Sequence, residues 1–235
     1  MKILLGIVPE THTRVVSLGI GIDQEMFCPS DRANARARLG LPKDRTMFLT
    51  VRRFTPRMGL IRLIQAMDEV LREFPDTQLL IVGEGPLKPT LAAEIARRDL
   101  QGKVTLVGSV PLADLPLYYQ AADLFVLPTE AYEGLGMSTL EALSCGTPVL
   151  GTQAGATPEI LRDFDLNLIV ASTSQHALAQ GMIAYMKRSP QEKIALQKNA
   201  RALIEKKYNW DRAVEELERI LSRIMSESNR ISPYK

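Results

Sequence analysis

From about residue 46 onward, short apolar runs alternate with longer amphipathic segments. The apolar runs predict strands at residues 46–51, 79–82, 104–107, 123–128, 148–150 and 168–170. The segments between them predict helices at 60–74, 87–98, 113–122, 137–144 and 157–161. Continuous apolar strands that each lead into a helix are typical of a parallel sheet covered on both faces. We therefore predict an α/β fold with a doubly wound, Rossmann-like parallel sheet.

Both ends of the chain depart from this alternation. Beyond residue 174 the pattern predicts only helices, at 174–187, 190–206 and 211–226. Apolar positions along 213–224 share one side of the last helix, so we expect exposed apolar surface in the isolated chain. Residues 15–18 fit an additional strand. We divide the chain into a short N-terminal remnant at 1–14, a single domain with a helical C-terminal extension at 15–228, and a tail at 229–235.

The composition is that of a globular protein, because 46% of the 235 residues are hydrophobic and 24% are charged. A net charge of +2 argues against nucleic-acid binding through bulk charge, and we expect no nucleic-acid partner. The chain has only two cysteines and two histidines. This argues against a disulfide framework and a histidine-based metal site, so we expect a cytoplasmic protein without a metal. No apolar run approaches the roughly 20 residues that span a bilayer.

Two loops at the predicted carboxyl ends of strands carry candidate ligand-binding groups. Folds of this class bind ligands at that edge of the sheet, near helix N-termini. Arg52, Arg53 and Arg57 lie between a strand and a helix, where an anion is favoured; the alternative is a solvated charged loop. Glu133 and Glu141 flank a glycine-containing turn, and carboxylates are strong acceptors for sugar and ribose hydroxyls. The alternative for this second loop is a capped helix start with exposed acids.

A third loop, at residues 83–86, contains two glycines after a middle strand. The dinucleotide-binding pattern Gly-x-Gly-x-x-Gly would require a third glycine where this chain has Lys88. We therefore expect a tight structural turn there rather than a site for NAD.

The order of several motifs along the chain carries more information than any one of them. These motifs lie at residues 18–23, 52–59, 80–86, 107–110, 119–128, 133–149 and 208–210. As an ordered set they resemble the C-terminal, donor-binding half of the group 1 retaining glycosyltransferases, which have the two-domain GT-B fold. The resemblance covers residues 15 to about 225.

This resemblance implies a role for each matching residue. Arg53 would bind the donor diphosphate, Glu133 would contact the transferred sugar, and Glu141 would hydrogen-bond the ribose hydroxyls. Arg53 and Glu133 are thus the implied catalytic residues. The turn before the helix would line the sugar and phosphate, and a second loop would border the base. The residues of these two segments are Gly134, Leu135, Gly136, Met137, Ser138 and Thr139, and Gly108, Ser109 and Val110.

The implied reaction moves a hexosyl group from a UDP-, GDP- or ADP-sugar to an acceptor with retention of configuration. Positive groups would stabilise the charge on the departing diphosphate. The GT-B class generally needs no metal, so no cofactor is expected beyond the nucleotide-sugar donor. Many members of the family act at membrane surfaces, and such an association stays open here.

Two positions depart from the family pattern. The lysine of the phosphate loop falls on Met58, which cannot donate a hydrogen bond to phosphate. Arg57 is the adjacent candidate for its replacement. The small glycine before the arginine is Arg52 in this chain, and such a large side chain is expected to crowd the loop.

Length is the larger departure, because residues 1–14 cannot supply an acceptor-binding domain. A truncated gene, an excised piece and one subunit of a split enzyme are the three explanations, the last with a separate acceptor-binding partner. Two alternative functions stay open. One is a non-catalytic regulatory or scaffolding subunit of the same fold, and the other is a different GT-B chemistry such as epimerisation of a sugar nucleotide.

Overall fold

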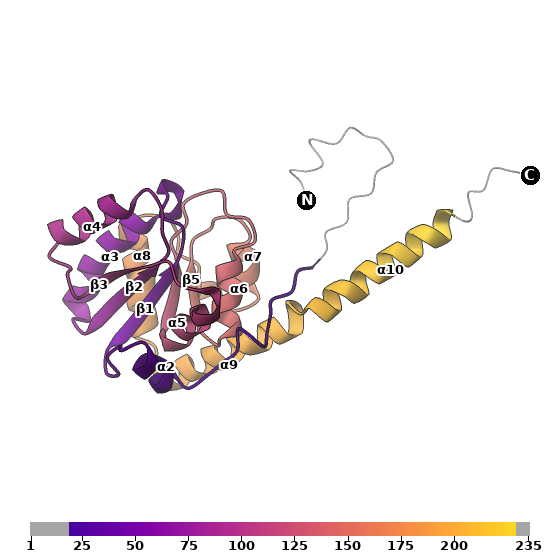
Figure 1. The fold of residues 1–235 in the computed structure, drawn as a ribbon, viewed down its shortest axis with the longest axis horizontal. Coiled ribbons are helices and arrows are strands. Elements are labelled where there is room, and N and C mark those ends of the chain that lie inside the picture. Colours follow the sequence, from indigo (N-terminus) through magenta and orange to yellow (C-terminus); the bar gives the residue numbers. More distant parts are fainter. Residues whose placement is uncertain (1–18, 229–235) are drawn as a thin grey trace, which may run out of the picture.

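The computed structural model describes residues 19–228 and contains a five-stranded parallel sheet (Figure 1). The strand order is β3-β2-β1-β4-β5, so the chain reverses its direction of travel across the sheet between β1 and β4. The strands are β1 (Thr46–Val51), β2 (Thr77–Val82), β3 (Val104–Gly108), β4 (Leu124–Leu127) and β5 (Val149–Gly151). The predicted doubly wound, Rossmann-like sheet is confirmed. The N-terminal remnant, the strand expected at 15–18 and the tail lie outside the described residues.

Helices cover both faces of the sheet, which explains why the strands are apolar throughout. The helices over one face are α3 (Leu60–Glu73), α4 (Lys88–Arg97) and α8 (Gln175–Met186). Those over the other face are α5 (Leu115–Ala121), α6 (Met137–Ser144), α7 (Thr157–Arg162) and α9 (Pro190–Lys207). Phe48 joins the first core, while its neighbours Met47 and Leu49 join the second, as the two-residue period of a strand requires.

The structure corrects two details of the predicted elements. The sequence pattern did not predict α2 (Arg32–Arg38), a short helix that packs against α5. The strand predicted at 168–170 is wrong: the chain forms a 3₁₀ turn over Leu166–Leu168 and only an isolated bridge between Gly151 and Ile169. The Asp165 carboxylate accepts a hydrogen bond from the backbone N–H of Asn167 at 2.9 Å, and this local bond favours the turn over an extended strand.

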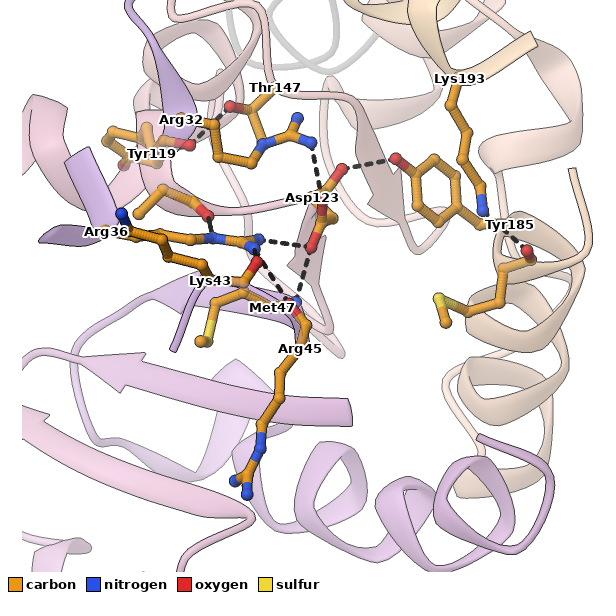
Figure 2. Close-up of polar contacts among 12 residues, drawn as sticks. Arg32, Arg36, Lys43, Arg45, Met47, Tyr119, Asp123, Thr147, Tyr185 and Lys193 are labelled. Atoms are coloured by element: carbon orange, nitrogen blue, oxygen red, sulfur yellow. Dashed lines mark hydrogen bonds and ion pairs between the residues drawn. The ribbon is translucent and has the colours of Figure 1, made fainter. Parts of the chain in front are cut away.

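At the amino end of the sheet, opposite the candidate loops, a polar cluster centres on Asp123 (Figure 2). Its carboxylate pairs with Arg32 at 2.8 Å and Arg36 at 2.7 Å, and accepts from the backbone N–H of Met47 at 2.7 Å. The Tyr185 hydroxyl donates to the Asp123 carbonyl at 2.6 Å. The buried Arg36 guanidinium also donates to three backbone carbonyls, those of Lys43, Arg45 and Ala121. The cluster thus ties α2 and α8 to the start of β1 and β4.

The last helix, α10 (Trp210–Ser228), extends away from the body of the domain (Figure 1). Large apolar side chains along it are exposed: Trp210, Val214, Leu217, Leu221, Ile224 and Met225. The expected exposed apolar surface is therefore confirmed. Within residues 19–228, no helix combines the length and the apolar character needed to cross a bilayer.

Candidate functional site

The loops that follow β1 and β4 lie together at the carboxyl edge of the sheet. The strand order reverses between these two neighbouring strands, and folds of this class bind ligands at such a position. The backbone N–H of Glu130 donates to the carbonyl of Arg57 at 2.8 Å, and the Arg57 guanidinium donates to the carbonyl of Tyr132 at 2.6 Å. The first loop therefore holds the backbone of the second.

Arg52 is the arginine of the first loop that turns inward. It forms an ion pair with Glu133, donates to the Thr129 hydroxyl, and lies 3.4 Å from the Ser138 hydroxyl. Only 8% of its side chain is exposed. Burial away from water lowers the pKa of Arg52 to about 10, and the Arg57 charge acts in the same direction, whereas Tyr119 and Glu141 oppose it. The guanidinium therefore remains charged at neutral pH.

The other candidates of this loop have different surroundings. Arg53 and Arg57 are exposed. Met58 is buried in the core beneath α3, which leaves the position of the family's phosphate lysine apolar. Gly59 adopts a left-handed φ of 69°, and a Cβ there would lie 1.9 Å from the carbonyl oxygen of Pro128. This close approach brings the start of α3 against the end of β4.

The glycine turn of the second loop leads directly into α6. Gly136 has a φ of 75° and precedes Met137, the first residue of the helix, and no described side chain caps this helix start. Uncapped amides and the helix dipole favour an anion there. Ser138 and Thr139 are buried, whereas Gly134 is exposed.

Glu133 and Glu141 lie on either side of this helix start, one in the turn and one in the second helical turn. The buried hydroxyl of Tyr119 donates to Oε2 of Glu141 at 2.6 Å. Burial raises the pKa of Glu141, while the Tyr119 hydrogen bond and the Arg52 charge lower it. Burial also raises the pKa of Tyr119 well above its usual value, so this phenol stays protonated as a donor.

The segment expected to border a nucleotide base follows β3. Gly108 accepts a hydrogen bond from the backbone N–H of Gly83 at 2.8 Å, Ser109 is exposed, and Val110 packs against the second core. The Gly83 turn supports this edge: a Cβ at Gly83 would lie 1.9 Å from the Arg52 carbonyl oxygen. The turn predicted at 83–86 forms slightly later in the chain, where the backbone N–H of Lys88 donates to the carbonyl of Gly85 at 3.1 Å.

The structure brings Arg52, Glu133, Glu141 and the amides of α6 into one site, and leaves Arg53 and Arg57 exposed at the first loop. Sequence reasoning did not include Thr129 or Tyr119. Tyr119 reaches Glu141 from α5, whereas Thr129 lies four residues before Glu133 in the same loop, and no motif marks either pairing. Within residues 19–228, no group of three or more histidine, cysteine, aspartate or glutamate side chains could hold a metal.

Comparisons with known proteins identify the family and the fold of this chain. The family model described as "Glycosyl transferases group 1" matches residues 31–203. A GDP-mannose-dependent monoacylated alpha-(1-6)-phosphatidylinositol monomannoside mannosyltransferase from Corynebacterium glutamicum is 30% identical over 90% of this chain and 57% of its own length.

Solved structures show the same fold. Sucrose-phosphate synthase from Thermosynechococcus elongatus superposes with a TM-score of 0.76 and 28% identity, covering 88% of this chain and 52% of that chain. Anabaena HepE in complex with UDP superposes with a TM-score of 0.77 and 23% identity, covering 86% of this chain and 56% of that chain. The chain thus spans about half the length of each of these proteins. Because the family model matches most of the chain, this protein belongs to the group 1 glycosyltransferase family.

Proposed function

We propose that the carboxyl edge of the sheet binds a nucleoside-diphosphate sugar as the donor for retaining transfer of a hexosyl group. The observation that carries this proposal is the arrangement of Glu133 and Glu141 on either side of the uncapped start of α6. A helix N-terminus favours the diphosphate, and two carboxylates can accept hydrogen bonds from two sets of hydroxyls. The donor chemistry of the mannosyltransferase relative and the UDP complex of HepE support this interpretation.

Within this proposal each group has one task. Glu141 binds the ribose hydroxyls, Glu133 binds the transferred sugar, and Arg53 and Arg57 bind the diphosphate from the exposed side of the first loop. Residues 108–110 border the base. The exposed arginines and the α6 amides then stabilise the negative charge that develops on the departing diphosphate, without a metal. An acceptor-binding domain or subunit completes the cleft in which transfer occurs.

The setting of the reaction is part of the proposal. Cys28 and Cys145 are both free thiols. Free thiols fit a reducing compartment, so we place the activity in the cytoplasm. The name of the C. glutamicum relative includes a phosphatidylinositol mannoside. An acceptor of that lipid class would bring this domain to a membrane surface.

Isothermal titration calorimetry with GDP-mannose, UDP-glucose and ADP-glucose tests donor binding. We expect one of the three to bind, and Glu141→Gln to weaken that binding by roughly 10- to 150-fold, because a hydrogen bond to a charged group is worth about 1.5–3 kcal/mol. Arg72→Gln, a change at an exposed arginine of α3, is the matched control and should bind as the wild type does. Failure of all three donors to bind at millimolar concentration would contradict the proposal.

Two observations favour a second candidate, a non-catalytic subunit. The apolar Met58 occupies the phosphate-lysine position, and the charge of Arg52 is neutralised by Glu133. A chain of this kind would bind nucleotide weakly and transfer no sugar. Sugar transfer by a complex with an acceptor-binding partner, abolished by Glu133→Ala, would exclude the second candidate, and analysis of the product would separate transfer from epimerisation.

A further inference from the structure

The two oxygens of the Glu133 carboxylate have different environments. Oε2 accepts a hydrogen bond from the Thr129 hydroxyl at 3.0 Å and pairs with the Arg52 guanidinium. Both contacts of the carboxylate with described residues are made by Oε2, which leaves Oε1 as the acceptor for a ligand. Only 11% of the Glu133 side chain is exposed, so little of it is open to solvent.

Arg52 has little capacity left for a ligand of its own. Its Nη2 atom serves both Thr129 and Glu133, and its Nη1 atom faces Ser138 at 3.4 Å. Its Nε atom is buried and has no acceptor among residues 19–228, so a ligand would reach it only after the loop had rearranged. The contacts of Arg52 therefore point to a supporting role within the protein.

The charge of Arg52 also matters for Glu133. A carboxylate this deeply buried is strongly disfavoured in its ionised form unless a cation lies beside it. The planar guanidinium can contact two oxygen acceptors at fixed geometry, whereas a lysine ammonium offers a point charge on a flexible stem. A large cation thus stands where the family pattern has a small glycine, and Glu133 is the acid it neutralises.

We propose that Arg52 is a positioning residue that holds the Glu133 carboxylate ionised and oriented, so that Oε1 accepts hydrogen bonds from the hydroxyls of the transferred sugar. This inference rests on the proposed function, because it assigns a support to a residue of the donor site. It also separates the arginines of the first loop: Arg53 and Arg57 act on the diphosphate, while Arg52 acts through Glu133 on the sugar.

The test compares the affinity for a nucleotide sugar with the affinity for the matching nucleoside diphosphate. Calorimetry with GDP-mannose and GDP, and with UDP-glucose and UDP, gives this ratio for the wild type and for Arg52→Met, Arg52→Lys and Glu133→Gln. Arg72→Gln is again the control. In Arg52→Met we expect the ratio to fall roughly 10-fold, as one charge-assisted hydrogen bond to the sugar is lost, with little change in affinity for the diphosphate alone. Arg52→Lys should give an intermediate ratio.

A double variant guards against misfolding. Arg52→Met combined with Glu133→Gln leaves no unpaired charge. The double variant should show the same affinity ratio as Arg52→Met alone, because each substitution removes the same interaction, the one between the Glu133 carboxylate and the sugar. Equal weakening of the diphosphate and the nucleotide sugar by Arg52→Met would show that Arg52 binds phosphate and would overturn the inference. A wild-type ratio in a folded Arg52 variant would do the same. If the wild type binds neither partner of any pair, the proposed function itself fails.

Discussion

Tyr119→Phe removes a single hydroxyl from the interior and leaves the aromatic ring in place. The ring of Tyr119 is fully buried, with its centroid 6.1 Å from that of Phe27 and 5.5 Å from that of Phe125. Its hydroxyl donates to Oε2 of Glu141 at 2.6 Å. Because phenylalanine preserves the ring packing, the substitution isolates the hydrogen bond to the carboxylate.

The expected loss follows from the nature of this bond. A hydrogen bond to a charged group contributes about 1.5–3 kcal/mol, and we expect the free energy of unfolding at neutral pH to fall by that amount. The bond also opposes the rise that burial causes in the pKa of Glu141, so its removal raises this pKa further. A carboxyl group whose pKa is raised on folding contributes stability below its unfolded-state pKa and loses it as the pH rises through the folded-state pKa. In the variant, the loss of unfolding free energy with rising pH should be larger and should continue to a higher pH.

Urea unfolding at neutral pH and at a pH near the ordinary pKa of a carboxyl group measures both effects. The difference from the wild type should be largest at neutral pH and should narrow in acid, where Glu141 is protonated. Tyr118→Phe is the matched control, since Tyr118 is the preceding residue of α5 and is only half-buried. Identical unfolding free energies for Tyr119→Phe and wild type at neutral pH would refute the reasoning.

The same variant tests the assignment of Glu141 to the ribose. A less readily ionised carboxylate should bind hydroxyls less well at mildly acidic pH, so the acid limb of nucleotide-sugar binding should move to higher pH. The binding of a donor analogue that lacks both ribose hydroxyls should show no such shift of its acid limb. If the shift persists, Glu141 contacts a part of the ligand other than the ribose.

Three further outcomes are expected. Arg36→Met should lower the unfolding free energy by about 3 kcal/mol in urea titrations. The substitution breaks the ion pair with Asp123 and leaves three backbone carbonyls without their donor. A loss below about 1 kcal/mol would mean that the cluster does not stabilise the fold. Gly155→Ala should displace the second loop, since a Cβ there would lie 2.0 Å from the Glu133 carbonyl oxygen at a φ of 57°, and calorimetry should show a reduced sugar preference. Burial raises the pKa of the Cys145 thiol, so mass spectrometry should find it unalkylated in the folded protein, and rapid labelling would contradict its burial.

The sheet and its order of elements were largely predictable because the information is local. Each buried strand is a continuous apolar run, and α3 has apolar residues at the spacing that its buried face requires. α2 escaped prediction because it is short and its sequence is rich in arginine and alanine, without an apolar stripe. Its burial depends on Arg36, whose partners lie on distant segments. The strand expected around Ile169 failed for a local reason, the side-chain hydrogen bond that forms a turn before it.

The candidate site, like the fold, was predictable from the sequence only in part. The positions of Glu133 and Glu141 followed from motifs, and the structure brings both to the start of α6. The orientation of Arg52 could not be predicted. Arg52 and Arg53 follow one another at a strand end, where successive side chains point in opposite directions, and the sequence does not show which of the two points toward Glu133. Only the pairing of β1 with β4 shows which of the two reaches Glu133. The role of Arg53 stays a prediction for calorimetry to test.

The reversal of strand order has a consequence for how the domain folds. β1, β2 and β3 follow one another in the sequence and lie side by side in the sheet. β4 comes after β3 in the sequence but pairs with β1, where Phe48 lies opposite Leu124. Closing so long a loop costs entropy before the new contacts stabilise it, so this pairing belongs among the late and slow events of folding. The loops after β1 and β4, which carry the proposed donor site, come together only when that event is complete. If the proposed site binds a nucleotide, its capture during refolding reports the moment at which β4 joins the sheet, rather than the earlier collapse of the first three strands.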